Sequence, residues 1–88
     1  MRSEDVRSIG EVLQDLRDAE GLVFEQVVRG LGETERTLRA IERGIVLPSQ
    51  EMDHRVARMF GRHENLVAEY RQAVAEARSL NVCAVKSA

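Results

Sequence analysis

The stretch that decides the fold is "GLGETERTLRAIERG", residues 30–44. Thr34 is a residue type that caps helix N-termini, and Gly44 is the type that ends helices in the left-handed conformation. Between them, Leu38 and Ile41 have the spacing of one inward-facing helical stripe. The stretch therefore predicts a glycine-containing turn and a short helix over residues 34–43, with arginines and glutamates on its outer side.

The residues before this stretch predict two further helices. "VFEQVVRGLG", residues 23–32, has helical apolar spacing and predicts a helix over 24–31. Two short helices joined by about four residues with a glycine have the spacing of a helix-turn-helix. Upstream, "SIGEVLQDLRDAEG" opens with Ser8 and Glu11 spaced as a capping box, and it predicts a helix over 9–20 that ends at Gly21.

The residues after the stretch predict two more helices. Pro48 ends an extended segment, and Ser49 is placed to cap a helix over 50–60. A long apolar stripe then predicts a helix over 64–80, followed by a tail over 81–88. We therefore expect an all-α fold, a compact four- to five-helix bundle in one domain over residues 1–80, with a helix-turn-helix.

Composition limits the possible functions. The chain has 88 residues and a formal net charge of −2. Residues 1–30 hold seven acids against four arginines, whereas residues 31–60 hold five acids and five arginines. Cys83 is the single cysteine, so we expect a free thiol in a reducing cytosol rather than an intermolecular disulfide. Because no apolar run is long enough for a membrane and the start lacks a secretory signal, we expect a cytoplasmic protein.

The order of these elements carries a resemblance. "IGEVLQDLRDAEGLVFEQVVRGLGETERTLRAIERGIVLPS…VARMFG" resembles the XRE-type helix-turn-helix family, the class of phage Cro proteins and lambda-type repressors. The most specific features are "IERG" at the end of the third helix and the proline four residues later. The resemblance covers roughly residues 9–66. It implies a transcriptional regulator, by default a repressor, that binds double-stranded DNA with a two-fold symmetric operator as a homodimer.

The resemblance also implies which side chains meet DNA. The second of the two turn-linked helices, residues 34–43, would lie in the major groove. Its base-contacting residues would be Glu35, Arg36, Arg39 and Ala40. Contacts to the DNA backbone would come from Thr34, Thr37 and Arg43, with Gln26 and Arg29 on the preceding helix as substitutes for a phosphate-gripping residue.

The chemistry of the outer side chains agrees with this role. Arg36 or Arg39 is able to donate two hydrogen bonds to guanine O6 and N7, while Glu35 accepts one from cytosine N4. A glutamate near phosphates lowers nonspecific affinity, so mixed charge favours selective binding. Glu35 and Arg39 also have the i,i+4 spacing of an ordinary surface ion pair, and the sequence leaves both interpretations open.

Several positions depart from the family pattern. Phe24 stands where a polar, phosphate-gripping residue is common, and Val28 where alanine is usual. Glu33, Gln50 and Asp53 replace apolar residues. The departures predict a slightly shifted packing within the same fold.

The last predicted helix has a larger apolar face than a small domain needs. Such a surplus is typical of a dimer interface. Alternatively, the helix packs back on the first one. The apolar "VCAV" in the tail either extends the interface or lies disordered. The interface residues would be Leu66, Val67, Tyr70, Val74, Ala77 and Leu80.

No pattern in the sequence indicates an enzyme. His54 and His63 lack the spacing and companions of a zinc site, so we expect no metal. We expect His63 to be a helix cap and His54 to be a surface or interface residue. We also expect no cofactor and no small-molecule ligand, so control would come through concentration, degradation or an antagonist or co-regulator protein. The alternative function is a protein-interaction module on the same fold, antitoxin-like and with little DNA binding.

Overall fold

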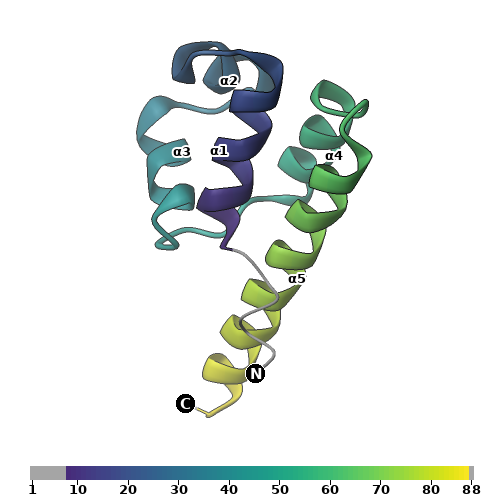
Figure 1. Cartoon of the computed structure of the whole chain (residues 1–88). Coiled ribbons are helices and arrows are strands. Elements are labelled where there is room, and N and C mark those ends of the chain that lie inside the picture. Colours follow the sequence, from purple (N-terminus) through teal and green to yellow (C-terminus); the bar gives the residue numbers. More distant parts are fainter. Residues whose placement is uncertain (1–7, 88) are drawn as a thin grey trace.

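The computed structural model describes residues 8–87, with side chains from 8 to 80, and every regular element in that part is a helix. The all-α fold is therefore confirmed. Figure 1 shows α1, α2 and α3 grouped together, with α4 and α5 alongside them. The elements in chain order are α1 (Ile9–Glu20), α2 (Phe24–Leu31), α3 (Glu35–Glu42), α4 (Gln50–Met59) and α5 (Glu64–Ser87).

Local signals begin and end the helices as the sequence predicts. The Ser8 hydroxyl accepts a hydrogen bond from the Glu11 amide at 3.2 Å, and the Glu11 carboxylate accepts one from the Ser8 amide at 3.3 Å. The hydroxyl of Ser49 accepts from the amide of Met52 at 3.1 Å. These contacts satisfy amide groups that the first turn of a helix leaves without intrahelical partners.

All five helices contribute to one hydrophobic core. Among the side chains that are completely covered are those of Tyr70 and Phe60, the largest in the core. Burial of this apolar surface is the main term that holds such a small domain together. The buried residues are Ile9, Val12, Leu13 and Leu16 from α1, Val27 and Leu31 from α2, Leu38 and Ile41 from α3, Met52 and Val56 from α4, Phe60 after it, and Val67, Tyr70, Ala73 and Val74 from α5.

A glycine sets the approach of α1 to α3. A Cβ built on Gly10 would overlap the carbonyl oxygen of Glu42, at the end of α3. Because that neighbour is backbone, it has little freedom to move aside. The glycine therefore lets the N-terminal part of α1 lie directly against the C-terminal part of α3, the helix whose outer face is the candidate site.

A polar network joins α4 to α5. The buried Tyr70 hydroxyl donates to the Oδ1 atom of Asp53 at 2.9 Å, and Arg78 pairs with Oδ2 of the same carboxylate at 2.9 Å. Arg78 also donates to the carbonyl of Pro48 at 2.8 Å. Burial, with the nearby Asp53 carboxylate, raises the pKa of Tyr70 above its usual value, so the hydroxyl stays a proton donor. Asp53, a departure from the apolar pattern, is thus an acceptor for two partners on α5.

The last helix is longer than expected. It extends to Ser87, past the predicted end at residue 80, and it projects beyond the other helices (Figure 1). The segment lacks a glycine or proline that would end the helix earlier. Residues 81–87, predicted to form a separate tail, are thus helical. The state of Cys83 and the role of "VCAV" concern side chains outside the described ones. No helix in the described part has the length and apolar character needed to cross a membrane.

Candidate DNA-binding surface

The candidate surface is built on α3, which is fixed at both ends. At its start, Thr34 accepts a hydrogen bond from the Thr37 amide at 3.1 Å. Leu38 and Ile41 are buried and hold the inner face against the core. At the end, Gly44 has φ 79°, in the left-handed region that favours glycine. An anchored helix of this kind presents its outer side chains on a rigid support.

The outer face of α3 carries the predicted base-contacting residues. Glu35, Arg36 and Arg39 are exposed, while Ala40 is half-buried beside them. Arg43, predicted to contact the DNA backbone, is exposed just after the helix. The structure therefore brings these residues together on one side of α3, opposite the buried pair that anchors it.

Glu35 and Arg39 form the ion pair that their spacing allows. The Arg39 Nη2 atom lies 3.6 Å from Oε2 of Glu35, and the side chains are 59% and 56% exposed. A pair with this much solvent access adds little to stability. Both groups thus keep enough accessible surface to exchange this contact for one with a ligand.

Phe24 contributes to the surface in a way that its sequence position does not indicate. The guanidinium carbon of Arg39 lies 4.4 Å from the centre of the Phe24 ring, and that of Arg17 lies 5.7 Å from it. Both distances fall within the range of cation–π attraction. From the sequence alone, Phe24 is an apolar residue at a position where a polar one is common. Its contact with Arg39 was not predicted, because a contact between α2 and α3 leaves no local pattern.

Glu42 lies beside the same arginines. Burial raises the pKa of the Glu42 carboxyl above its ordinary value, while the charges of Arg17 and Arg39 act in the opposite direction. The carboxylate is therefore disfavoured by its surroundings, although two guanidinium groups compensate part of that cost. Its negative charge moderates the positive potential of the face that Arg39 shares.

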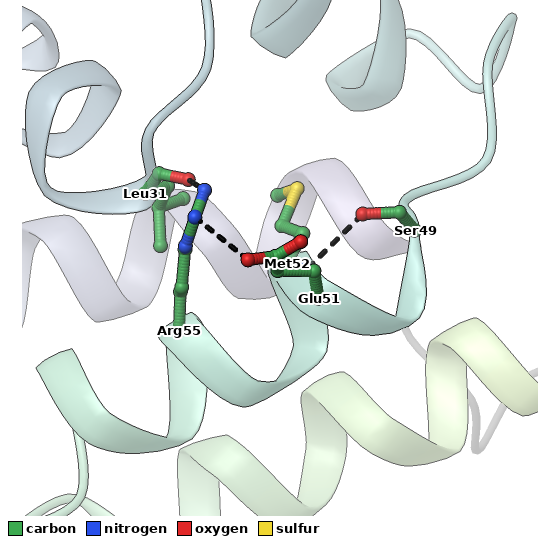
Figure 2. A network of polar contacts seen from close by, with 5 residues as sticks. All are labelled: Leu31, Ser49, Glu51, Met52 and Arg55. Atoms are coloured by element: carbon green, nitrogen blue, oxygen red, sulfur yellow. Dashed lines mark hydrogen bonds and ion pairs between the residues drawn. The ribbon is translucent and has the colours of Figure 1, made fainter.

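The turn before α3 is tied to α4. Gly32 ends α2 with φ 69°, and the Arg55 side chain donates to the carbonyl of Leu31 at 3.1 Å. Arg55 also pairs with Glu51 at 2.8 Å, so one guanidinium joins the end of α2 to the first turn of α4 (Figure 2). A Cβ on Gly32 would overlap this guanidinium. These contacts hold the end of α2, and with it the start of the turn that leads to α3, against α4.

Gln26, Thr34 and Thr37, three of the other candidates for DNA-backbone contact, also make hydrogen bonds within the chain. The Gln26 Oε1 atom accepts from the Val23 amide at 2.9 Å, which satisfies an amide group at the start of α2. The hydroxyl of Thr34 donates to that of Thr37 at 2.9 Å. Arg29 is exposed on α2. Gln26 and the two threonines thus shape helix ends next to the surface.

The predicted dimer residues on α5 are not equally available. Val67, Tyr70 and Val74 are buried in the chain's own core, because α5 packs back on α1. This is the alternative that the sequence left open, and it accounts for these three side chains. Leu66 and Ala77 are half-buried, whereas Leu80 is 64% exposed. An interface along α5 would therefore rely on Leu66, Ala77 and Leu80.

The two histidines occupy different surroundings. The His63 Nε2 atom lies 2.7 Å from Oε2 of Glu20, which joins the residue just before α5 to the end of α1. His54 is exposed on α4, as predicted. Within the described part of the chain, no three histidine, cysteine or acidic side chains gather in a way that would hold a metal ion.

Comparison with known proteins assigns the family. A family model described as "Helix-turn-helix domain" matches residues 8–70. Comparisons with curated proteins and with solved structures give no match. The matched residues span most of the chain and include α1 to α4, the turn before α3 and the capping residues described above. The chain therefore belongs to the helix-turn-helix domain family.

Proposed function

We propose that this protein is a sequence-specific DNA-binding transcriptional regulator of the XRE type, which inserts α3 into the major groove. The observation that carries the proposal is the outer face of α3, where Arg36 and Arg39 project from a helix anchored on its other side and Arg43 follows directly after it. An α-helix fits the width of the major groove, and arginine is the residue best suited to guanine and phosphate.

The exposed side chains suggest a division of roles along α3. Arg36 and Arg39 donate to guanine O6 and N7, and Glu35 accepts from cytosine N4. Ala40 provides apolar contact next to them. Gln26, Arg29, Thr34, Thr37 and Arg43 contact the sugar–phosphate backbone, which positions the helix without reading sequence.

A homodimer on a two-fold symmetric operator completes the proposal. Two copies of α3 would then enter successive major grooves about one turn of DNA apart, and occupancy of the operator would repress transcription by excluding polymerase. The exposed Leu80 supplies apolar surface on α5 for the contact between copies, together with the uncovered parts of the half-buried Leu66 and Ala77. Sedimentation of the free protein over a concentration series measures this association, and Leu80→Glu should weaken it.

The decisive experiment is selection of bound DNA from random and genomic fragments at two salt concentrations. The wild-type protein should enrich a two-fold symmetric site, and the double variant Arg36→Glu/Arg39→Glu should lose it. Arg58→Glu/Arg71→Glu is the matched control, since it reverses two exposed arginines on α4 and α5. Failure of the wild-type protein to retain DNA even at low salt would overturn the proposal.

The second candidate is a protein-interaction module, antitoxin-like, with little DNA binding. This function is favoured by the acidic side chains that lie among the arginines of the α3 surface, because they reduce its attraction for phosphate. Glu35 pairs with Arg39, and Glu42 lies near the same guanidinium. Such a partner would tolerate reversal of Arg36 and Arg39 if it bound through α5. Loss of partner binding on Leu80→Glu, with no DNA retained by the wild type, would support this function.

A further inference from the structure

Phe24 contacts side chains of two helices, α1 and α3, that are far apart in the sequence. It is the first residue of α2 and packs half-buried against the hydrophobic core. Its ring lies near Arg17 of α1 and closer still to Arg39 of α3, at 5.7 and 4.4 Å. The ring position is therefore set by the core, while the guanidinium beside it belongs to the exposed surface.

Arg39 is held from two directions. The Phe24 ring attracts its guanidinium, and the Glu35 carboxylate lies 3.6 Å from Nη2. Exposed arginines ordinarily sample many rotamers, and fixing one on binding costs conformational entropy. A side chain that already lies in a restricted arrangement has less of that entropy to lose on binding. The restricted arrangement also favours a ligand group placed to match its geometry over one that is not, and this difference makes the contact selective.

The neighbouring Arg36 supplies an internal comparison. Among the described residues, Arg17 and Arg39 are the arginines whose guanidinium groups lie beside an aromatic ring. Arg36 is exposed on the same helix, one turn closer to its start. A change at Phe24 is thus expected to act on one of the two arginines and to spare the other.

We propose that Phe24 is a positioning residue for Arg39, and that its ring sets the selectivity of the base pair that Arg39 reads. The inference rests on the proposed function, because it assumes that α3 reads DNA. It goes further by assigning a specificity role to a residue of α2 that itself contacts no base.

The first test uses the free protein. Two variants distinguish the effect of the aromatic ring from the effect of a bulky apolar side chain. Phe24→Leu keeps an apolar side chain without a ring, and Phe24→Tyr keeps the aromatic face. The δ-methylene protons of Arg39 should show a ring-current shift in the wild-type NMR spectrum and in Phe24→Tyr, and should lose it in Phe24→Leu. An unchanged shift in Phe24→Leu would overturn the proposal, and circular dichroism checks that both variants remain folded.

The second test is selection of DNA sites with the same proteins. Arg39→Ala and Arg36→Ala first identify the base pair that each arginine reads. Phe24→Leu should then reduce the preference at the Arg39 position by about two- to fivefold, the range that an exposed cation–π contact provides. The preference at the Arg36 position should remain, and Phe24→Tyr should behave as the wild type.

The outcomes distinguish the two proposals. If the wild type selects a site and Phe24→Leu keeps the full preference at the Arg39 position, Phe24 is only a packing residue and the inference fails alone. An equal loss of preference at both arginine positions also overturns it, because it indicates a general disturbance of α3. If the wild type selects no DNA, the proposed function fails and the positioning role fails with it.

Discussion

At Gly10, the absence of a side chain determines how closely α1 approaches α3. Within a helix, replacing glycine by alanine normally stabilises by about 0.5–1 kcal/mol. Here the added Cβ would overlap the carbonyl oxygen of Glu42, a backbone atom. We therefore expect Gly10→Ala to destabilise the fold by about 1–3 kcal/mol, the usual cost of overpacking. Urea unfolding followed by circular dichroism measures the change.

Gly30→Ala is the matched control for that prediction. Its new Cβ would meet the Sδ and Cε atoms of Met59 at 2.5 Å, and these are the far end of a flexible side chain. Because Met59 is able to change rotamer, we expect a loss below about 1 kcal/mol. Equal stabilities of the two variants would contradict the account of the close approach between α1 and α3.

Glu42 predicts a dependence of stability on pH. Burial raises the pKa of this carboxyl in the folded state, so the folded protein holds the proton more tightly than the unfolded chain. The resulting stability is present at acidic pH, and it is lost as the pH rises from the ordinary carboxyl range through the raised value. Glu42→Gln removes the ionisation and should be more stable than the wild type at neutral pH, by a small amount because the group is partly solvated.

Unfolding free energies of the wild type and Glu42→Gln, compared at neutral and at acidic pH, provide the measurement. The advantage of the variant should disappear at acidic pH, where the wild-type carboxyl is itself neutral. An advantage of equal size at both pH values would indicate a difference in packing and not in ionisation.

The contacts of Asp53 on α4 with Tyr70 and Arg78 link α4 to α5, so the effects of mutations at these residues on the free energy of unfolding should depend on one another. Tyr70→Phe removes the hydroxyl that donates to Asp53 and should cost about 1–2 kcal/mol. Asp53→Ala should cost more, about 2–3 kcal/mol, because it leaves the buried hydroxyl without its acceptor and removes the pairing with Arg78.

The double variant provides the check on that network. In Tyr70→Phe there is no hydroxyl left to lose its acceptor when Asp53 is replaced. The double variant should therefore lose less free energy of unfolding than the sum of the two single variants. Thermal and urea unfolding of the four proteins complete this cycle. Additive costs would show that Tyr70 and Asp53 do not depend on each other.

The helices illustrate what is readable from sequence. Ser8, Thr34, Ser49 and Gly44 act on residues within one turn, so their types and spacing predict where helices begin and end. The same holds for the outer face of α3, because helical periodicity separates it from the buried pair. These local rules cover most of the fold and the composition of the candidate site.

Contacts between helices are harder to predict from the sequence than the helix ends are. Asp53 interrupts an apolar stripe, and only the position of Tyr70 on another helix shows why a carboxylate is there. Likewise, the apolar stripe of α5 does not reveal whether its partner is α1 or a second copy. Phe24 beside Arg39 is a third example, since the two residues meet only after α2 and α3 have turned toward each other.

For the molecule as a whole, the net charge of −2 makes DNA binding depend on where its cations lie. Each phosphate neutralised on binding changes the slope of log K against log salt by about −0.9. Arg43→Ala should therefore reduce the slope by about 0.9 for each bound subunit and weaken binding to all sequences alike. Arg58→Ala, on α4, is the control. Fluorescence anisotropy over a salt series measures both, and a loss confined to one sequence would show that Arg43 reads a base.

The packing of α5 on α1 has a consequence for synthesis on the ribosome. The segment that forms α3 leaves the exit tunnel well before the residues that complete the core, since Val67, Tyr70, Ala73 and Val74 follow it in the chain. Until they emerge, the apolar side of α1 lacks its cover, and contacts distant in sequence are not available to hold α3 in place. Prematurely terminated chains would thus lack a stably held α3.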